Sequence, residues 1–328
     1  MSDARFDVCA IGNAIVDVLA QAEDSFLDQQ GLPKGAMSLI DADRAQALYS
    51  LMGPGVETSG GSAGNTAAGI AALGGKVAYI GKVADDQLGD VFRHDISAVG
   101  VTFSTPPISQ KLPTARSFIF VTPDAQRTMQ TFLGACTLLG PDDIDIDTVA
   151  NSQVVFIEGY LWDLPAAIEG ILKAAKAAKS AGRKVSFTTS DPFCVGRFRD
   201  QFLDFIRNDV DILFCNEAEI LSLFQTEDFD AAVEKVRGMA EIVAVTRSEK
   251  GSVIVTKDET HIIPAQKVDV VDTTGAGDAY AAGFLYGYTQ GKPLDVCGKL
   301  GGLVASEAIS HYGARAETDL KALVASAL

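Results

Sequence analysis

The sequence predicts an α/β fold with a mostly parallel central sheet and helices on both of its faces. Apolar strand-like runs alternate with helix-like segments along the chain, which is the order that βαβ units produce. A chain of 328 residues with 47% hydrophobic content can bury a large core, and neither a low-complexity linker nor an internal repeat divides it. We therefore expect residues 1–328 to form a single domain.

The alternation is carried by twelve segments with clear periodicity. Short apolar runs predict buried strands at 6–12, 76–80, 154–157, 184–187, 212–214 and 242–245. Apolar residues at helical spacing predict helices at 63–73, 88–99, 165–181, 230–239, 277–287 and 296–310. Strands that are joined by such helices run parallel, because the connection must return to the same end of the sheet.

Two segments, 14–41 and 101–132, interrupt this order. Polar and apolar residues alternate over 114–121, and a turn sequence with Pro123 follows at 122–126. We expect both segments to be extended antiparallel pieces inserted at the edge of the sheet. Together they would form a small β lid over the functional site.

The composition excludes several classes of function. Lys and Arg number 27 against 43 for Asp and Glu, so the net charge is −16, which disfavours nucleic acid and anionic membranes as partners. No signal peptide or run of about 18 apolar residues is present. We expect a cytoplasmic protein that is a monomer or a homodimer. We expect neither disulfides nor a zinc site among its five cysteines, which are far apart in the sequence: Cys9, Cys136, Cys194, Cys215 and Cys297.

The segment 272–278, Asp-Thr-Thr-Gly-Ala-Gly-Asp, is the most informative motif. Gly275 and Gly277 allow the backbone N–H groups around Ala276 to point into one concavity, and the helix expected after them adds its positive dipole end. Such a turn suits phosphate oxygens. Asp278 would lie in the first helical turn, within reach of a hydroxyl proton. The alternative is a plain helix start with a capping Asp.

A second glycine-rich loop, Gly60-Gly61-Ser62-Ala63-Gly64-Asn65, brings backbone close to a ligand, and the Asn65 amide can both donate and accept hydrogen bonds. The same letters satisfy G-x-S-x-G, the nucleophile elbow of serine hydrolases. An elbow follows a short apolar strand, which residues 53–59 do not resemble. A P-loop is absent from the sequence, and Tyr280 replaces the third glycine of a dinucleotide fingerprint.

Near the N-terminus, Asn13 and Asp17 follow the first predicted strand, where α/β proteins collect ligand groups. The Asp17 carboxylate could accept two hydrogen bonds from a vicinal diol. In isolation, both residues would be turn formers.

Taken together, these motifs resemble the ribokinase-like (PfkB) carbohydrate and nucleoside kinase family over about residues 12–315. The resemblance implies that Asp278 is the catalytic base, that the 275–277 turn binds phosphate, and that Gly60, Gly61 and Asn65 bind the sugar. Asn216 and Glu219 are similar to the family's N-x-x-E, which orders Mg²⁺ around ATP. Thr246 to Gly251 resembles its nucleotide loop, with Ser248 in place of a glycine. Arg127 matches an arginine that can reach the transferring phosphate.

Within that family, the adenosine kinase branch is the most similar, through Asn13, Asp17 and the segments 26–32, 158–161 and 190–193. The resemblance implies transfer of phosphate from ATP·Mg²⁺ to the 5′-hydroxyl of adenosine, and it leaves open a monovalent cation such as K⁺. A purine would lie among apolar side chains: Met37, Met129, Leu133, Leu161 and Phe193. The alternatives are a sugar kinase of the same fold and a non-catalytic nucleoside-binding relative.

Overall fold

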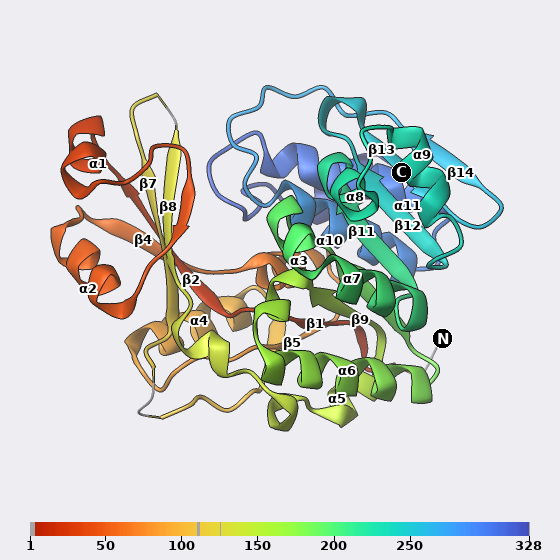
Figure 1. Ribbon diagram of the computed structural model, residues 1–328, viewed down its shortest axis with the longest axis horizontal. Helices are drawn as coiled ribbons and strands as arrows, with labels where there is room; N and C mark the ends of the chain where they lie inside the picture. Colours follow the sequence, from red (N-terminus) through yellow and green to blue (C-terminus); the bar gives the residue numbers. More distant parts are fainter. Residues whose placement is uncertain (1–3, 110–111, 125, 328) are drawn as a thin grey trace.

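The computed structural model describes residues 4–109, 112–124 and 126–327, and within these ranges the strands form two sheets (Figure 1). The larger sheet has nine strands in the order β14-β13-β12-β11-β10-β9-β1-β5-β6. Its strands are β1 (Phe6–Ile11), β5 (Val77–Ile80), β6 (Val101–Phe103), β9 (Ser152–Glu158), β10 (Lys184–Thr188), β11 (Ile212–Asn216), β12 (Ile242–Thr246), β13 (Ser252–Val255) and β14 (Thr260–Ile263). All neighbours from β6 to β12 are parallel, and β13 and β14 add an antiparallel edge. The predicted α/β fold is confirmed.

The second sheet is smaller, with five strands in the order β3-β8-β7-β2-β4. Its strands are β2 (Ile15–Gln21), β3 (Met37–Leu39), β4 (Gly55–Gly60), β7 (Ala115–Val121) and β8 (Arg127–Phe132). The helices are α1 (Asp24–Gln30), α2 (Ala42–Leu51), α3 (Ser62–Ala72), α4 (Gln87–Ala98), α5 (Ile146–Ala150), α6 (Pro165–Ser180), α7 (Pro192–Asn208), α8 (Glu217–Phe224), α9 (Phe229–Val236), α10 (Ala276–Thr289), α11 (Leu294–Ala308) and α12 (Leu320–Ala327).

The two faces of the large sheet bury different clusters, because side chains alternate along each strand. On β1, Cys9 and Ile11 join a core that includes residues of α6, α7, α8 and α9. Val8 and Ala10 point the other way, into a core shared with α3, α4 and α10. This second core continues into the small sheet through residues of β2 and β7, so it joins the two sheets.

The predicted lid segments differ from the structure in four respects. The small sheet is separate from the large sheet instead of extending its edge, and its β2–β7 and β3–β8 pairs are parallel. β4 belongs to it although residues 55–60 lie outside both segments, whereas β6 joins the large sheet. The prediction relied on local alternation, and strand partners are chosen by packing at long range. α1 and α2 lie on the outer side of this sheet, away from the large lobe (Figure 1).

Helix α10 is packed unusually tightly against two neighbours. A Cβ on Gly69 of α3 would lie 2.7 Å from the Cβ of Ala282, and one on Gly283 would lie 2.5 Å from the carbonyl oxygen of Leu300 on α11. Only glycine permits such close approach of the helix backbones. α10 is therefore held between α3 and α11, and this packing fixes the direction of its first turn.

Two further features concern the chain as a whole. All five cysteines are free and buried. In the part of the chain that the structure describes, no helix combines the length and the apolar character needed to cross a membrane.

Candidate active site

The N-termini of α3 and α10 meet, so that the two glycine-rich motifs of the sequence lie together. The pairing is direct, since Asp278 in the first turn of α10 accepts hydrogen bonds from Ser62 and Asn65 in the first turn of α3. These motifs are more than two hundred residues apart in the chain. Helix N-termini carry partial positive charge, so their meeting point favours an anion.

The turn before α10 is open towards this meeting point. Gly275 is its N-cap, with φ 74° and ψ 4°, and a Cβ there would lie 2.5 Å from the Cβ of Ala314. A Cβ on Gly277 would meet no atom within 4 Å. Among the described residues, the N–H groups of Gly277 and Asp278 have no hydrogen-bond acceptor. The turn thus offers unpaired donors beside free space, as an anion site requires.

Asp278 is oriented by donors from α3. Ser62 Oγ donates to its Oδ1 at 2.7 Å and Asn65 Nδ2 donates to its Oδ2 at 3.1 Å. Burial raises the pKa of Asp278 to about 6, while the bonds from Ser62 and Asn65 and the charge of Arg315 lower it. A carboxylate with a pKa slightly below neutrality is ionised at pH 7 and is still basic enough to accept a proton.

Asp17 lies on β2 next to the same loop. β2 and β4 are antiparallel, with Ile15 opposite Gly60, and a Cβ on Gly60 would overlap the Asp17 carboxylate. No hydrogen bond to the Asp17 carboxylate is found among the described residues, so its oxygens remain available to a ligand. Burial raises the pKa of Asp17 to about 7, and Arg315 opposes this more strongly than Arg127.

Asn13 is held by Glu158, the first residue of the segment 158–161, to which the sequence analysis assigned no role of its own. Glu158 is fully buried at the end of β9, and it accepts the Asn13 N–H, the Asn13 side-chain amide and the Ala63 N–H, each at 2.8 Å. Gly61, with φ 81°, brings its Cα against the Asn13 carbonyl. Burial raises the pKa of Glu158 to about 7. The sequence did contain a signal for Glu158, because it is an acidic residue directly after the predicted buried strand 154–157.

A strand does precede the G-x-S-x-G sequence, which corrects the sequence analysis. β4 ends at Gly60, and its first four residues are exposed or half-buried, so no apolar run marked it. Ser62 nevertheless donates its hydroxyl proton to Asp278 instead of to a histidine. The described residues contain no hydrogen bond between Ser62 and His94, His261 or His311, so the arrangement of a serine hydrolase is not formed.

Asn216 and Glu219 form a reciprocal capping box at the start of α8. The Glu219 N–H donates to Asn216 Oδ1 at 2.9 Å, and Glu219 Oε2 accepts the Asn216 N–H at 3.0 Å. Thr189 Oγ1 adds a bond of 2.6 Å. Glu219 is 4% exposed, and burial raises its pKa. No cluster of three or more His, Cys, Asp or Glu able to hold a metal is found among the described residues.

The loop from Thr246 to Gly251 joins β12 to β13. Ser248, which occupies a glycine position of the family pattern, has φ 50°, and Gly251 has φ 84°. Ser248 therefore adopts a left-handed conformation although it is not a glycine. Arg247 stacks over Phe229 and binds both oxygens of Glu217, at 3.1 and 3.0 Å.

Arg127 connects the small sheet to the α10 turn. Its Nη1 lies 2.8 Å from Asp272 Oδ2, and both side chains are 7% exposed. The pair is not aligned as a hydrogen bond, and the Arg127 guanidinium nitrogens have no hydrogen-bond partner among the described residues. Asp272 also accepts the N–H groups of Thr274 and Gly313. Arg127 is buried, so it is not the exposed surface charge that a lone arginine would usually be.

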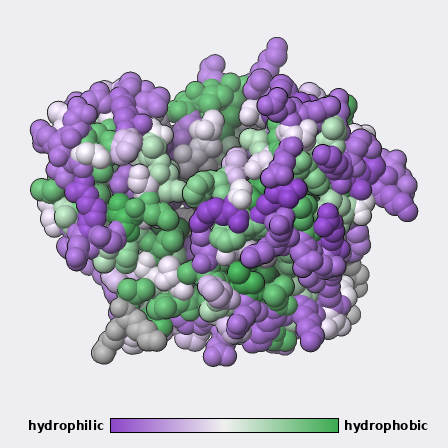
Figure 2. All heavy atoms as spheres, in the orientation of Figure 1, coloured by the Kyte–Doolittle hydropathy of each residue, from purple (hydrophilic) through white to green (hydrophobic). Residues whose placement is uncertain are grey.

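The five apolar residues predicted to hold a base are only partly brought together. Met37 and Met129 are register partners on β3 and β8, and Met37 is 53% exposed. Figure 2 shows hydrophobic residues along the boundary between the small-sheet lobe and the larger lobe. Leu161 is fully buried in the core of the large sheet, so core packing accounts for it. Phe193 is 71% exposed on α7, and Leu133 is half-buried beyond β8.

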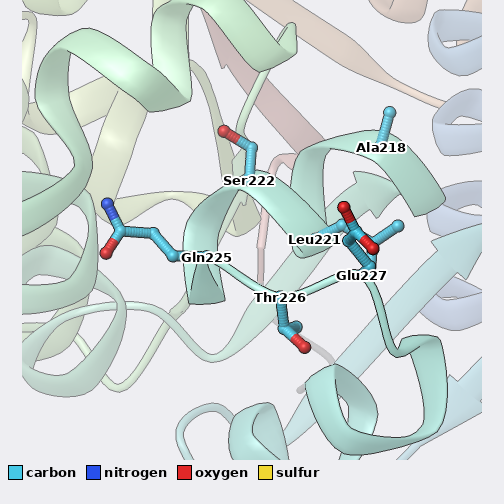
Figure 3. A pocket seen from close by; sticks show the side chains of 6 residues that line it. All are labelled: Ala218, Leu221, Ser222, Gln225, Thr226 and Glu227. Carbon is cyan, nitrogen blue, oxygen red and sulfur yellow. The ribbon is translucent and has the colours of Figure 1, made fainter.

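A separate hollow of about 620 Å³ runs along the outside of α8. Figure 3 shows its side chains directed away from one another, with no common point between Ser222, Gln225 and Thr226. It includes none of the predicted site residues.

The chain is similar in sequence and in structure to known kinases. The family model described as pfkB family carbohydrate kinase matches residues 37–321. The structure of a probable sugar kinase from Rhizobium etli is 54% identical, covers 99% of both chains and superposes with a TM-score of 0.92. That of adenosine kinase from Sinorhizobium meliloti is also 54% identical, with 99% and 100% coverage and a TM-score of 0.92. A sugar kinase of Archaeoglobus fulgidus described as uncharacterised is 33% identical over 75% of this chain and 96% of its own.

Proposed function

Because this chain belongs to the pfkB family of carbohydrate kinases, we propose that it transfers the terminal phosphoryl group of ATP to the 5′-hydroxyl of adenosine, giving AMP and ADP. Transfer to an alcohol is the chemistry of the family. The observation that carries the proposal is the position of the Asp278 carboxylate, held by Ser62 and Asn65 at the open N-terminus of α10.

In this proposal Asp278 accepts the proton of the attacking hydroxyl. The hydrogen bonds from Ser62 and Asn65 fix which carboxylate oxygen faces the hydroxyl. The unpaired N–H groups of Gly277 and Asp278 lie at the positive end of the helix, where they can stabilise negative charge that develops on the phosphoryl oxygens. Catalysis then rests mainly on positioning and electrostatics, as is usual for phosphoryl transfer.

Asp17 and Asn13 are proposed to bind the ribose. The Asp17 oxygens have no protein partner among the described residues, which suits a vicinal diol with two donor hydroxyls. Glu158 holds Asn13 from behind through two hydrogen bonds, so the amide is presented in one orientation. Met37 and Met129, on the adjoining strands, are the apolar residues best placed to contact a base.

ATP and Mg²⁺ fit the residues present to different degrees. The turn at Gly275–Gly277 offers unpaired N–H groups and space, which fits a phosphate. Asn216 and Glu219 are occupied by each other, so we propose that they act on Mg²⁺ through its bound waters, which this ion usually keeps. The bound ion would neutralise charge on the phosphates. A requirement for K⁺ stays a prediction, to be tested by replacing potassium with a tetramethylammonium salt.

Similarity also supports a second candidate, a sugar kinase of the same fold, since two of the relatives above carry that name. A substrate panel at fixed ATP separates the two. We expect kcat/KM for adenosine to exceed that for ribose and fructose by roughly 10²-fold or more, because burying a purine face contributes a few kcal/mol at about 1.4 kcal/mol per tenfold.

Inosine is the matched control in this panel, since it changes only the purine edge. Ribose or fructose used as well as adenosine would replace the proposal with the sugar kinase. Preference for inosine would keep the mechanism and change the acceptor. Binding of adenosine without turnover of any acceptor would instead indicate a non-catalytic nucleoside-binding protein.

A further inference from the structure

Arg315 lies half-buried in the segment between α11 and α12, and its guanidinium group is directed at the glycine loop of α3. It donates through Nη2 to the Ser59 hydroxyl at 2.8 Å and to the Ser59 carbonyl oxygen, and through Nη1 to the Gly64 carbonyl oxygen at 3.3 Å. All of these acceptors are neutral. Within the described residues, Arg315 forms no ion pair with a carboxylate.

Such an arrangement needs an explanation, because a charge that is partly withdrawn from water and has no charged partner is destabilising. Burial lowers the pKa of Arg315, and the carboxylates of Asp95, Asp17 and Asp278 act against this. Asp95 is linked to Arg315 only through Ser59, because it accepts hydrogen bonds from the Ser59 N–H at 2.8 Å and from the Ser59 hydroxyl. The other two carboxylates belong to the proposed active site.

Arg315 supplies positive charge to a site that is rich in carboxylates. Asp17 and Glu158 are carboxylates whose pKa values the Asp278 charge raises, so three acidic groups surround the glycine loop. The neutral side chains that bond the Asp278 carboxylate are Ser62 and Asn65, and the Tyr160 hydroxyl, whose pKa the Asp278 charge also raises, is bonded to Asp191. Arg127 acts on Asp17. Arg315 is the cation that acts on both Asp17 and Asp278.

We propose that Arg315 is a positioning residue for phosphoryl transfer: it fixes the turn from Ser59 to Gly64 against the segment that follows α11 and favours the ionised Asp278 carboxylate that receives the proton of the acceptor hydroxyl. This inference rests on the proposed function, in which Asp278 is the base. Two roles are therefore combined in one side chain, a mechanical role through hydrogen bonds and an electrostatic role through charge.

The variants Arg315→Gln and Arg315→Lys separate these roles. Glutamine keeps amide donors for the two carbonyl oxygens but removes the charge, whereas lysine keeps the charge. We expect the acid limb of the kcat/KM profile to move up by about one pH unit in Arg315→Gln, at the lower end of the range for a carboxylate that loses a nearby cation. Activity at pH 6.5 should then fall several-fold more than at pH 8.5. Arg315→Lys should keep the limb near its original position.

The matched control is Arg116→Gln, which removes a buried arginine from β7. Arg116 lies beside Tyr49 and Phe118, and its pKa responds to Asp86, not to Asp17 or Asp278. Its acid limb should not move. An unmoved limb in Arg315→Gln, with equal loss at every pH, would overturn the electrostatic role. Thermal unfolding of each variant identifies any loss that comes from misfolding.

Carboxyl ¹³C NMR of Asp-labelled protein gives a readout that does not depend on turnover. The Asp278 resonance, assigned with Asp278→Asn, should titrate at higher pH in Arg315→Gln than in the wild-type protein. If no acceptor is phosphorylated but this shift is observed, the proposed function fails while the effect of Arg315 on Asp278 stands. If turnover is observed and neither the NMR midpoint nor the acid limb moves, the inference about Arg315 fails alone.

Discussion

The N-termini of α10 and α8 carry a carboxylate at the same helical position and use it in opposite ways. Asp278 and Glu219 are each the third residue of their helix. In α8 the N-cap is Asn216, and Glu219 folds back to accept the N-cap N–H, so the helix end is closed. In α10 the N-cap is Gly275, which has no side chain, and Asp278 instead reaches across to α3.

This difference shows how the N–H groups at a helix N-terminus are kept free for a ligand. A capping box satisfies the N–H groups of the N-cap and of the third helical residue within the helix itself, so fewer donors are left for an anion. A glycine N-cap leaves those donors unpaired, and a carboxylate held by another helix stays beside them without occupying them. The acidic residue is a helix cap in α8 and a candidate base in α10, although the two sequences look alike at this position.

The largest expected effect comes from Asp278→Asn. Removing a positioned general base typically lowers turnover by about 10²–10⁴-fold. Folding should be unaffected because the Asn oxygen still accepts one of the two hydrogen bonds. We would measure kcat together with adenosine binding by calorimetry. Retention of more than about a tenth of wild-type kcat would show that the base is another residue.

A second test closes the open end of α10 by steric means. Gly275→Ala places a Cβ in the left-handed region and against Ala314, so we expect a loss of about 1–2 kcal/mol in the free energy of unfolding. The displaced turn should lower kcat/KM by tenfold or more. Adding Ala314→Gly removes the clash but not the strained φ. The double variant should therefore recover part of the activity, and no recovery would point away from this contact.

Glu219→Gln tests the closed helix end. We predict a several-fold increase in the Mg²⁺ concentration for half-maximal rate, since one charge near the bound waters is lost. Asn216→Asp is a useful companion, because it keeps the cap acceptor for the Glu219 N–H. An unchanged Mg²⁺ titration in Glu219→Gln, with only a lower Tm, would mean that this motif is a helix cap and nothing more.

The smallest expected effect is on the way in which the stability of the folded protein changes with pH. The pKa values of Asp17 and Glu158 are raised to about 7 and that of Asp278 to about 6, well above the unfolded values near 4. The folded protein thus holds more protons between about pH 4 and 7, so these groups make stability fall as pH rises through that window. Groups with lowered pKa, such as Asp124, act mainly below pH 4.

The ligand-free protein should therefore melt at a higher temperature at pH 5.5 than at pH 7.5. About 1 kcal/mol moves the Tm of a protein this large by roughly 2 °C. Asp278→Asn should reduce the difference, because it removes one of the three groups. An equal slope in wild type and variant would contradict the assignment of Asp278 as a titrating group in this range.

Much of the fold could be predicted from the sequence because periodicity is local information. All six predicted strands and all six predicted helices are present, within a few residues at their ends. α7 was not predicted, although Asp191 caps it and Pro192 occupies its first position, a typical start signal. Its apolar residues Val195, Phe202 and Ile206 also follow helical spacing, so this helix could have been predicted.

The site was predictable to the extent that it depends on backbone turns. The Gly60–Gly61 and Gly275 turns were recognised from glycine, which signals a required backbone conformation. The bonds from Ser62 and Asn65 to Asp278 depend instead on how α3 packs against α10, and no spacing rule contains that information. Arg315 gave no local signal at all, since a single arginine in an irregular segment is usually exposed.

The five buried cysteines can report the order in which parts of the molecule open. Each thiol is enclosed, and burial raises the pKa values of Cys9, Cys194 and Cys297 to about 12, so a thiol reagent can modify them only after the chain around them opens. They are spread over different layers: Cys136 follows the small sheet, Cys9 and Cys215 lie in the large sheet, and Cys297 lies on α11. The order in which they become labelled would therefore record which layer separates first, and how far a bound substrate delays it.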